Sequence, residues 1–166
     1  SYYAEFIPEG LIWQFTDHEK QFAYWIVEMH GSKGQVVWTE SKGSSSFGSD
    51  GDQVAYQRTL LIREAYEGGQ DHVRQVWQFS ENPLWEGGDL VIISEILTAL
   101  EMRKEGESIG FYDPDTDKRI GPFLEIVARD MDGREITLEP SLDEKTVRIT
   151  IPAGWLYQIG AIGATP

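Results

Sequence analysis

The sequence contains no cysteine. This absence excludes disulfide bonds, thiolate metal sites and a cysteine nucleophile, although it does not fix the cellular compartment. Basic residues are also scarce, because 14 Lys and Arg stand against 28 Asp and Glu, a formal net charge of −14 in 166 residues. Binding to nucleic acid and to anionic lipid both depend on Lys and Arg. We therefore expect neither a nucleic-acid partner nor a membrane partner.

Long hydrophobic runs and catalytic motifs are missing as well. No apolar stretch approaches the roughly 18 residues of a membrane helix, so we expect a soluble protein. The glycine patterns that bind dinucleotides or phosphates are absent, as is the Gly-x-Ser-x-Gly turn of serine hydrolases. These absences favour a non-catalytic protein over an enzyme. A carboxylate-based hydrolase stays as an alternative, but among 28 acidic residues no particular pair stands out.

Aromatic residues are abundant, at 12% of the chain with six Trp, seven Tyr and seven Phe. Aromatic side chains favour strands and bury large areas, so the composition indicates an all-β core. The length is close to that of one domain and is sufficient to bury a substantial core. We predict a single all-β domain over residues 1–166.

Alternating apolar residues separated by turn residues predict three hairpins. The first joins residues 22–27 to 36–39, and the second joins 54–66 to 73–79. The third joins 124–128 to 136–138 through Asp132-Gly133, a pair that favours a tight two-residue turn. A further half-buried strand is predicted at 147–151, where Val and Ile alternate with Arg and Thr.

One segment has helical spacing instead. Ile93, Ile96, Leu97 and Leu100 fall at i, i+3, i+4 and i+7, which predicts an α-helix over residues 94–105. The resulting expectation is a mainly β protein, an antiparallel β-sandwich or jelly roll with this one helix. A closed β-barrel with one packed helix is the alternative.

Asp113, Asp115 and Asp117 are the candidate metal ligands. Alternating carboxylates at the start of a loop are the kind of ligand that calcium recruits. The match to a complete calcium loop fails, because Lys118 replaces the glycine at the sixth position and Leu124 replaces the glutamate at the twelfth. Pro and Asp also supply ordinary turn geometry, so we favour a turn and no cofactor over a calcium site.

Histidine chemistry has little support. His18 lies between Asp17 and Glu19, where a carboxylate neighbour would suit a general base. Adjacent residues rarely converge on one point, however, and no recognisable nucleophile lies nearby in the sequence. A solvated turn is therefore the favoured interpretation of this triplet.

The aromatic residues provide the remaining functional candidates. Trp85 lies in a loop with Asn82 and Glu86, where an exposed indole flanked by hydrogen-bonding groups suits binding to a protein or a sugar. Trp25 and Trp38 lie on predicted strands, and a sheet with one covered face would leave some of these rings in solvent. Core packing is the competing role for all three.

Three functions follow from these observations. The favoured one is a non-catalytic recognition module that binds a protein or carbohydrate partner through exposed aromatic residues on an acidic surface. The first alternative is a lipocalin-like β-barrel that carries a small apolar ligand. The second is the carboxylate-based hydrolase. Composition and spacing do not separate them further.

Overall fold

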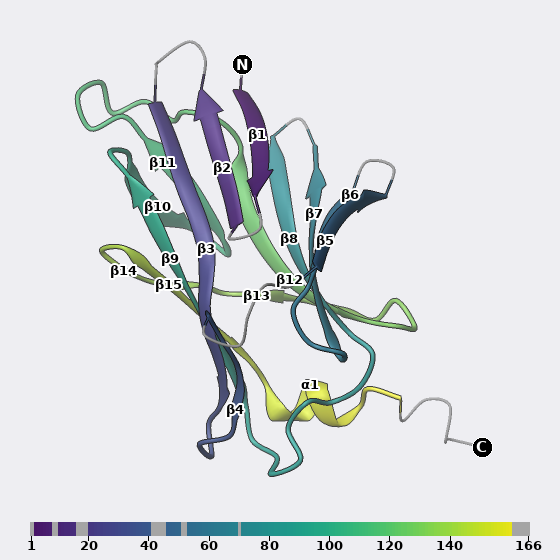
Figure 1. Cartoon of the computed structure of the whole chain (residues 1–166). Coiled ribbons are helices and arrows are strands. Elements are labelled where there is room, and N and C mark those ends of the chain that lie inside the picture. Colours follow the sequence, from purple (N-terminus) through teal and green to yellow (C-terminus); the bar gives the residue numbers. More distant parts are fainter. Residues whose placement is uncertain are drawn as a thin grey trace.

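The computed structural model describes residues 2–7, 10–15, 20–40, 46–50, 53–69 and 71–160. Strands dominate this part of the chain, and they form two separate sheets with one short helix (Figure 1). The described strands do not join into one closed sheet, so the predicted sandwich is confirmed and the barrel alternative is not.

The first sheet is antiparallel throughout. Its strands follow the order β1 (Tyr2–Ile7), β2 (Gly10–Phe15), β3 (Lys20–Gly31), β9 (Leu90–Thr98), β15 (Thr146–Ile151) and β14 (Ser141–Asp143), and β4 (Val36–Thr39) pairs with the second half of β3. The turn between β3 and β4 is the first predicted hairpin. Gly34 has φ +99° there, a backbone conformation that glycine adopts readily.

The second sheet contains one parallel pair, β8 with β12, whereas we expected antiparallel pairing throughout. Its strands follow the order β10 (Glu101–Glu105), β11 (Ser108–Tyr112), β12 (Phe123–Asp130), β8 (His72–Phe79), β7 (Ile62–Gly68), β6 (Gln53–Gln57) and β5 (Ser46–Asp50), with β13 (Glu135–Leu138) on β12. The predicted strand over 54–66 is two strands, β6 and β7. The predicted hairpin of β12 and β13 is confirmed, but its turn is not the two-residue turn expected of Asp132-Gly133. The Asp130 amide donates to the Arg134 carbonyl oxygen, so residues 131–133 form the turn, and Gly133 has positive φ whereas Asp132 does not.

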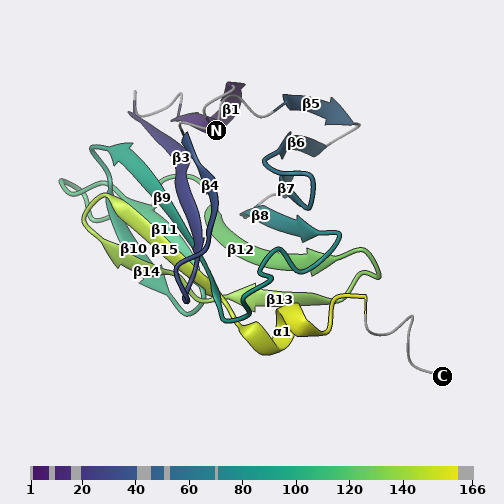
Figure 2. The ribbon, with the colours of Figure 1, turned by 60° about the horizontal axis from the view of Figure 1, so that its bottom comes forward.

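The core lies between the two sheets, which form the two layers seen in Figure 2. Alternate residues of each central strand point inward, so Phe22 and Ile96 of the first sheet and Trp77 and Phe111 of the second are buried. The rings of Phe22 and Phe111 stack across the interface, with centroids 4.2 Å apart. Most of the aromatic residues whose burial the structure describes therefore belong to the core.

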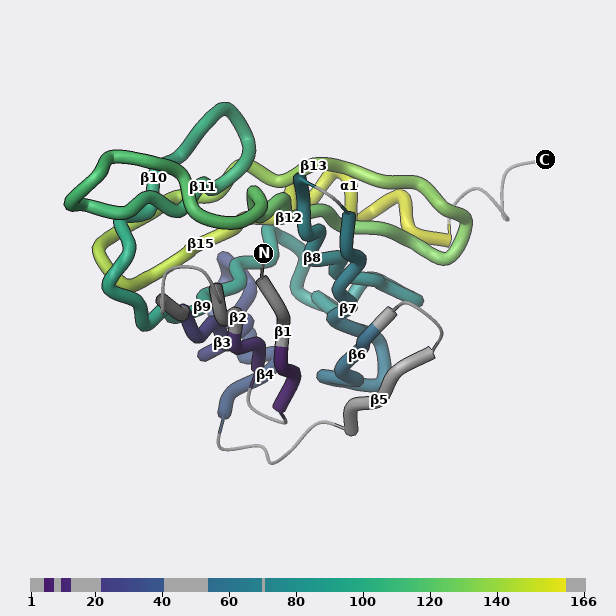
Figure 3. The backbone as a smooth tube through the Cα atoms, turned by 90° about the horizontal axis from the view of Figure 1, so that it is seen from above, coloured from purple at the N-terminus to yellow at the C-terminus, as the bar shows by residue number. Residues whose placement is uncertain are grey.

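At one side of the sandwich, β1 lies across from β6 and β7 (Figure 3). Tyr56 of β6 connects the sheets there, because its hydroxyl lies 2.7 Å from the carbonyl oxygen of Ile7 and 2.8 Å from that of Gly10. The rings of Phe6 and Tyr66 also meet, with centroids 5.4 Å apart.

The prediction of a helix over residues 94–105 is wrong. Residues 90–98 form strand β9, and the chain then crosses within two residues to strand β10. Leu90, Ile92, Ser94 and Ile96 point inward with a period of two, whereas Leu97 is 59% exposed on the outer face. The helical spacing arose because Leu97 is an exposed residue of the strand, and because Leu100 lies in the crossover that follows it. The one described helix is instead α1 (Ala153–Tyr157), which is five residues long and is separated from β15 by Pro152 alone.

Candidate functional site

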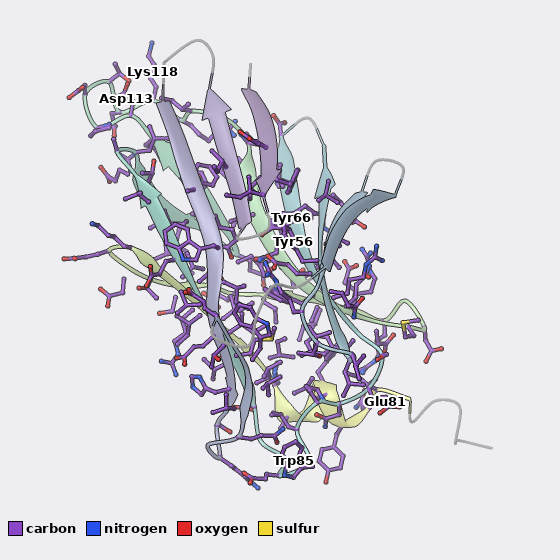
Figure 4. All side chains as sticks on the ribbon, in the orientation of Figure 1. Tyr56, Tyr66, Glu81, Trp85, Asp113 and Lys118 are labelled. Carbon is purple, nitrogen blue, oxygen red and sulfur yellow. The ribbon has the colours of Figure 1, made fainter. Side chains whose placement is uncertain are left out.

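The best candidate site is the loop of residues 80–89, which connects β8 to β9 and is called the Trp85 loop below. The Trp85 side chain is 81% exposed, as the sequence suggested, and it lies at one end of the sandwich (Figure 4). Two hydrogen bonds shape the chain around it. The Leu84 amide donates to Asn82 Oδ1 at 3.0 Å, and the Gly87 amide donates to the Leu84 carbonyl oxygen at 3.1 Å. Asn82 therefore shapes the loop.

The residue before the exposed indole anchors the loop to the core. Leu84 is 4% exposed and belongs to the main apolar core. Its side chain packs so closely on Gly31 that a Cβ atom there would lie 2.9 Å from Leu84 Cδ2. In addition, the buried Gln35 side chain donates from Nε2 to the Pro83 carbonyl oxygen at 2.9 Å. The turn between β3 and β4 thus supports the base of the loop.

Two glycines and Asp89 fix the far end of the loop. Gly87 and Gly88 have φ values of +75° and +91°, and a Cβ at Gly88 would lie 2.5 Å from Ser32 Oγ. The backbone of Asp89 exchanges two hydrogen bonds with Ser32, at 2.8 and 2.9 Å. Substituting either glycine would therefore strain the loop.

Asp89 also connects the Trp85 loop to helix α1. Its Oδ1 accepts a 2.8 Å hydrogen bond from the amide of Ala153, the first residue of the helix. The last helical residue, Tyr157, is 75% exposed. One end of the sandwich therefore carries two exposed aromatic residues on elements that are bonded together. Glu81 and Glu86 are exposed on the same loop.

The other two tryptophans proposed as binding residues lie elsewhere. Trp38 is 5% exposed, so the structure contradicts the expectation that it faces solvent. It is buried because β4 turns it toward the core, where the Arg58 guanidinium lies 5.4 Å from its ring centroid. Trp25 is half-buried on the outer face of β3, paired with Gly10 on one side and Glu95 on the other. Neither lies on the Trp85 loop.

The three candidate metal ligands form a turn. Asp113 Oδ1 accepts a 2.8 Å hydrogen bond from the Asp115 amide, and the Asp113 carbonyl oxygen accepts another from the Asp117 amide at 2.8 Å. The Asp117 carboxylate pairs with Arg103. Within the described part of the chain, no three His, Asp or Glu side chains are grouped so that they could hold a metal ion. This turn lies at the opposite end of the molecule from Trp85 (Figure 4).

The most unusual buried group is a polar cluster between the sheets. Glu64 Oε1 accepts from Arg58 Nε at 2.8 Å, and Glu64 Oε2 accepts from the Tyr66 hydroxyl at 2.6 Å and from Gln75 Nε2 at 2.8 Å. Gln75 in turn accepts from the Tyr24 hydroxyl of the opposite sheet at 2.7 Å. Burial, followed by the charge of Glu64, holds the pKa of Tyr66 well above its usual value. The carboxylate already has three protein donors, so its chemistry is structural.

An acid–base enzyme would need a pair of carboxylates at one site. The buried carboxylates among the described residues are Glu64, Asp113 and Asp130, and each has its own partners in a different part of the fold. Asp130 is bonded to Arg134 through Nε at 2.9 Å. Residues 17–19, with the candidate base His18, lie outside the described residues. No two of these three buried carboxylates share a site.

Comparisons of this chain with protein-family models, with curated proteins and with solved structures found no match. In the part of the chain that the structure describes, no helix is long and apolar enough to cross a membrane.

The outer face of the second sheet is unsuited to an apolar contact. A central row of small residues, Ala55, Ala65, Val76 and Val127, is buried there. Charged side chains flank this row and pair with one another. The pairs are Arg74 with Glu67, Glu125 and Glu135, and Arg129 with Glu67 and Glu135. Since these charges are mutually satisfied, this face resembles a solvated surface.

Sequence reasoning missed the residues that support the Trp85 loop. Gln35, Leu84 and Asp89 hold it in place, yet each contact joins positions far apart in the chain. The Gly-Gly pair after Trp85 was the available signal for a fixed turn. Glu64 was also missed, although it alternates with Ile62 and Tyr66 and so shares their inward face. A carboxylate at such a position indicates a buried cationic partner.

Proposed function

We propose that this chain is a non-catalytic recognition module that binds a protein partner at the Trp85 end of the sandwich. The observation that carries the proposal is an indole 81% exposed on a loop whose two sides are bonded to other elements. Tryptophan is enriched among the residues that dominate protein interfaces, and it is usually well buried in a free protein. An exposed indole on a fixed loop is therefore best explained by a partner that covers it.

The way the loop is held favours tight binding. Binding to a mobile segment costs conformational entropy, which reduces affinity. Here the carbonyl oxygen of Pro83, two residues before Trp85, accepts from Gln35, and Asp89 bonds to Ser32 and to Ala153. The backbone that presents the indole is thus ordered before a partner arrives. Exposed Tyr157 on the bonded helix extends the same end with a second aromatic ring.

The charge of this end favours a basic partner. Glu81 and Glu86 are exposed on the loop, where Lys33 Nζ beside Gly87 is a single opposing charge, and the whole chain carries −14. Complementary charge accelerates encounter and selects partners. A Lys or Arg side chain can also lie over an indole face, a contact worth about 0.5–1 kcal/mol at an exposed site. We therefore favour a basic segment of a protein over a neutral carbohydrate.

Selection from a displayed random-peptide library tests this function. Peptides enriched on the wild-type protein are expected to be rich in Lys and Arg and to lose at least about tenfold in affinity for Trp85→Ala, a change of about 1.4 kcal/mol. Leu60→Ala is the matched control, because Leu60 is 95% exposed on the turn between β6 and β7. That variant should bind the peptides like the wild type.

Two further experiments test the role of the loop's charge and the class of ligand. Glu86→Gln is expected to weaken binding modestly and to reduce its dependence on salt, because rim charges are screened by ions. A glycan array probed with the wild type and with Trp85→Ala provides the other arm. Binding of glycans that depends on Trp85, without binding of any basic peptide, would overturn the protein-partner assignment. Equal binding of peptides by Trp85→Ala would overturn the site.

A further inference from the structure

A cleft of about 370 Å³ lies at the side edge of the sandwich, away from the Trp85 loop. It is bounded by the end of β9, the crossover to β10 and the turn between β14 and β15, and is called the edge cleft below. At this edge the first sheet ends in the three-residue strand β14 (Figure 2). The volume falls within the range of small-molecule sites, about 300–1,000 Å³.

The buried and half-buried members of the edge cleft lining are apolar apart from Thr98. Ile96 and Leu100 are 2% and 6% exposed, and Met102 and Leu142 are half-buried beside them. Methionine adapts its shape to different ligands because its side chain is unbranched and flexible. A hydrogen bond of 2.8 Å from the Ile96 amide to the Lys145 carbonyl oxygen joins two walls of the cleft. This lining suits an aliphatic group.

The exposed members of the lining are charged. They are Glu101, Glu144 and Lys145. Glu101 accepts a 3.0 Å hydrogen bond from Arg103 Nε, so part of its charge is compensated. The remaining pair is Glu144 and Lys145, on a chain whose net charge is −14. The overall field therefore favours a ligand with a positive end over one with a negative end.

Glu144 carries an independent sign of function. It is the first residue of a two-residue turn between the paired residues Asp143 and Thr146, and its φ is +43°. Glycine or asparagine is preferred at such a position, because a longer side chain is strained there. Two-residue hairpin turns require positive φ at this position, and non-glycine residues held in it cluster at active sites and ligand-binding sites. The strain here places a carboxylate in the lining of the cleft.

We infer that the edge cleft binds a small aliphatic molecule with a positively charged amine, with the hydrocarbon against Leu100 and Leu142 and the ammonium group near Glu144. This inference does not depend on the proposed function, because the cleft and the Trp85 loop use different elements. The probe is octylamine, which is protonated at neutral pH, and octanoate is the matched anion with a chain of the same length.

The experiment follows backbone amide signals by NMR during titration with each probe. Octylamine is expected to bind saturably and to shift the amides of Ile96, Leu100 and Lys145, with octanoate at least about tenfold weaker. Leu142→Trp should fill the cleft and remove these shifts. Leu97→Trp is the control, because Leu97 is exposed on the outer face of the first sheet. It should leave octylamine binding unchanged.

Two changes at Glu144 keep the test informative if Leu142→Trp does not fold. Glu144→Lys should reduce or reverse the preference for octylamine over octanoate. Glu144→Gly should weaken octylamine binding and yet raise Tm by about 2 °C, because it relieves the strained backbone. Saturable binding retained in Leu142→Trp, a preference for octanoate, or no saturable binding of octylamine would each overturn the inference.

Discussion

Arg58 and Glu64 form an ion pair inside the sandwich. Arg58 Nε and Nη2 lie 2.8 and 2.7 Å from Glu64 Oε1, and the two side chains are 2% and 1% exposed. The Arg58 guanidinium also lies 4.4 Å from the ring centroid of Tyr56, whose hydroxyl donates across to the carbonyl oxygen of Ile7 at the end of β1. The pair thus belongs to the contacts that hold the two sheets together.

Removing one member of this pair should destabilise the fold strongly. Glu64→Ala leaves the Arg58 charge buried without its carboxylate, and breaking a buried pair in this way costs about 3–5 kcal/mol. The free energy of unfolding, measured by urea denaturation, should fall by that amount. A loss below about 1 kcal/mol would contradict a fully formed buried pair.

The double variant Arg58→Met with Glu64→Leu separates the charge from the packing. Both charges are then absent, so the unfolding free energy should recover much of the loss seen in Glu64→Ala. Tyr66 and Gln75 still lose their acceptor, which costs about 1–3 kcal/mol for each buried polar group left unpaired. Recovery is therefore expected to be partial.

Stability should fall steeply at alkaline pH. Burial, together with the charge of Glu64, raises the pKa of Tyr66. The unfolded chain releases this proton at a pH near 10, whereas the folded chain retains it. The stability is therefore fully present below about pH 10 and decreases as the pH rises above it. Urea midpoints measured over this range should show the decrease.

Tyr66→Phe tests the origin of the alkaline effect. It should flatten the dependence on pH, at a cost near neutral pH of about 1.5–3 kcal/mol for the lost hydrogen bond to the Glu64 carboxylate. Tyr157→Phe removes an exposed hydroxyl instead and should leave the profile of the wild type. An unchanged slope in Tyr66→Phe would assign the effect to other groups, such as Tyr24, whose pKa burial also raises.

Turn chemistry and alternation were sufficient to predict much of the fold. The hairpins of β3 with β4 and of β12 with β13 were predicted from the glycines in their turns. In the structure these glycines, Gly34 and Gly133, have positive φ. The exposure of Trp85 followed from its polar loop neighbours. These features are local, so one sequence contains the information that determines them.

Features that depend on distant contacts were not predicted. The helix predicted over 94–105 is strand β9 followed by β10, because Ser94 points inward and Leu97 outward. Ser94 is accommodated in the core by a hydrogen bond with Tyr24, a residue on another strand. The parallel pairing of β8 with β12 and the support of the Trp85 loop by Gln35 likewise join separate segments. No local pattern encodes such contacts.

The turn between β12 and β13 should lose stability in acid. Burial alone would raise the pKa of Asp130, but hydrogen bonds from the Arg134 side chain and from the backbone amides of Arg134 and Asp132 outweigh it, so the pKa is lowered. The contribution to stability is thus present above the unfolded pKa, near 4, and is lost as the pH falls below it.

Asp130→Asn should reduce this acid dependence in thermal unfolding measured from neutral pH down to about pH 3. At neutral pH it should cost about 1–2 kcal/mol, since the carboxylate charge that pairs with Arg134 is removed. Asp132→Asn, at an exposed position of the same turn, is the control and should behave like the wild type. A similar flattening by both variants would contradict a specific role for Asp130.

Two tryptophan truncations should differ sharply in their effect on stability. Trp77 is fully buried between the sheets, and Trp77→Ala should lower the unfolding free energy by about 3–5 kcal/mol, as expected for emptying an aromatic core site. Trp85 is 81% exposed, and its loop is held by the backbone and by Leu84, so Trp85→Ala should change stability by less than about 0.5 kcal/mol. In acrylamide quenching, Trp85→Ala should remove an accessible component of the tryptophan emission. A large loss of stability in Trp85→Ala would instead show that the indole supports the fold, and the proposed binding site would lose its main support.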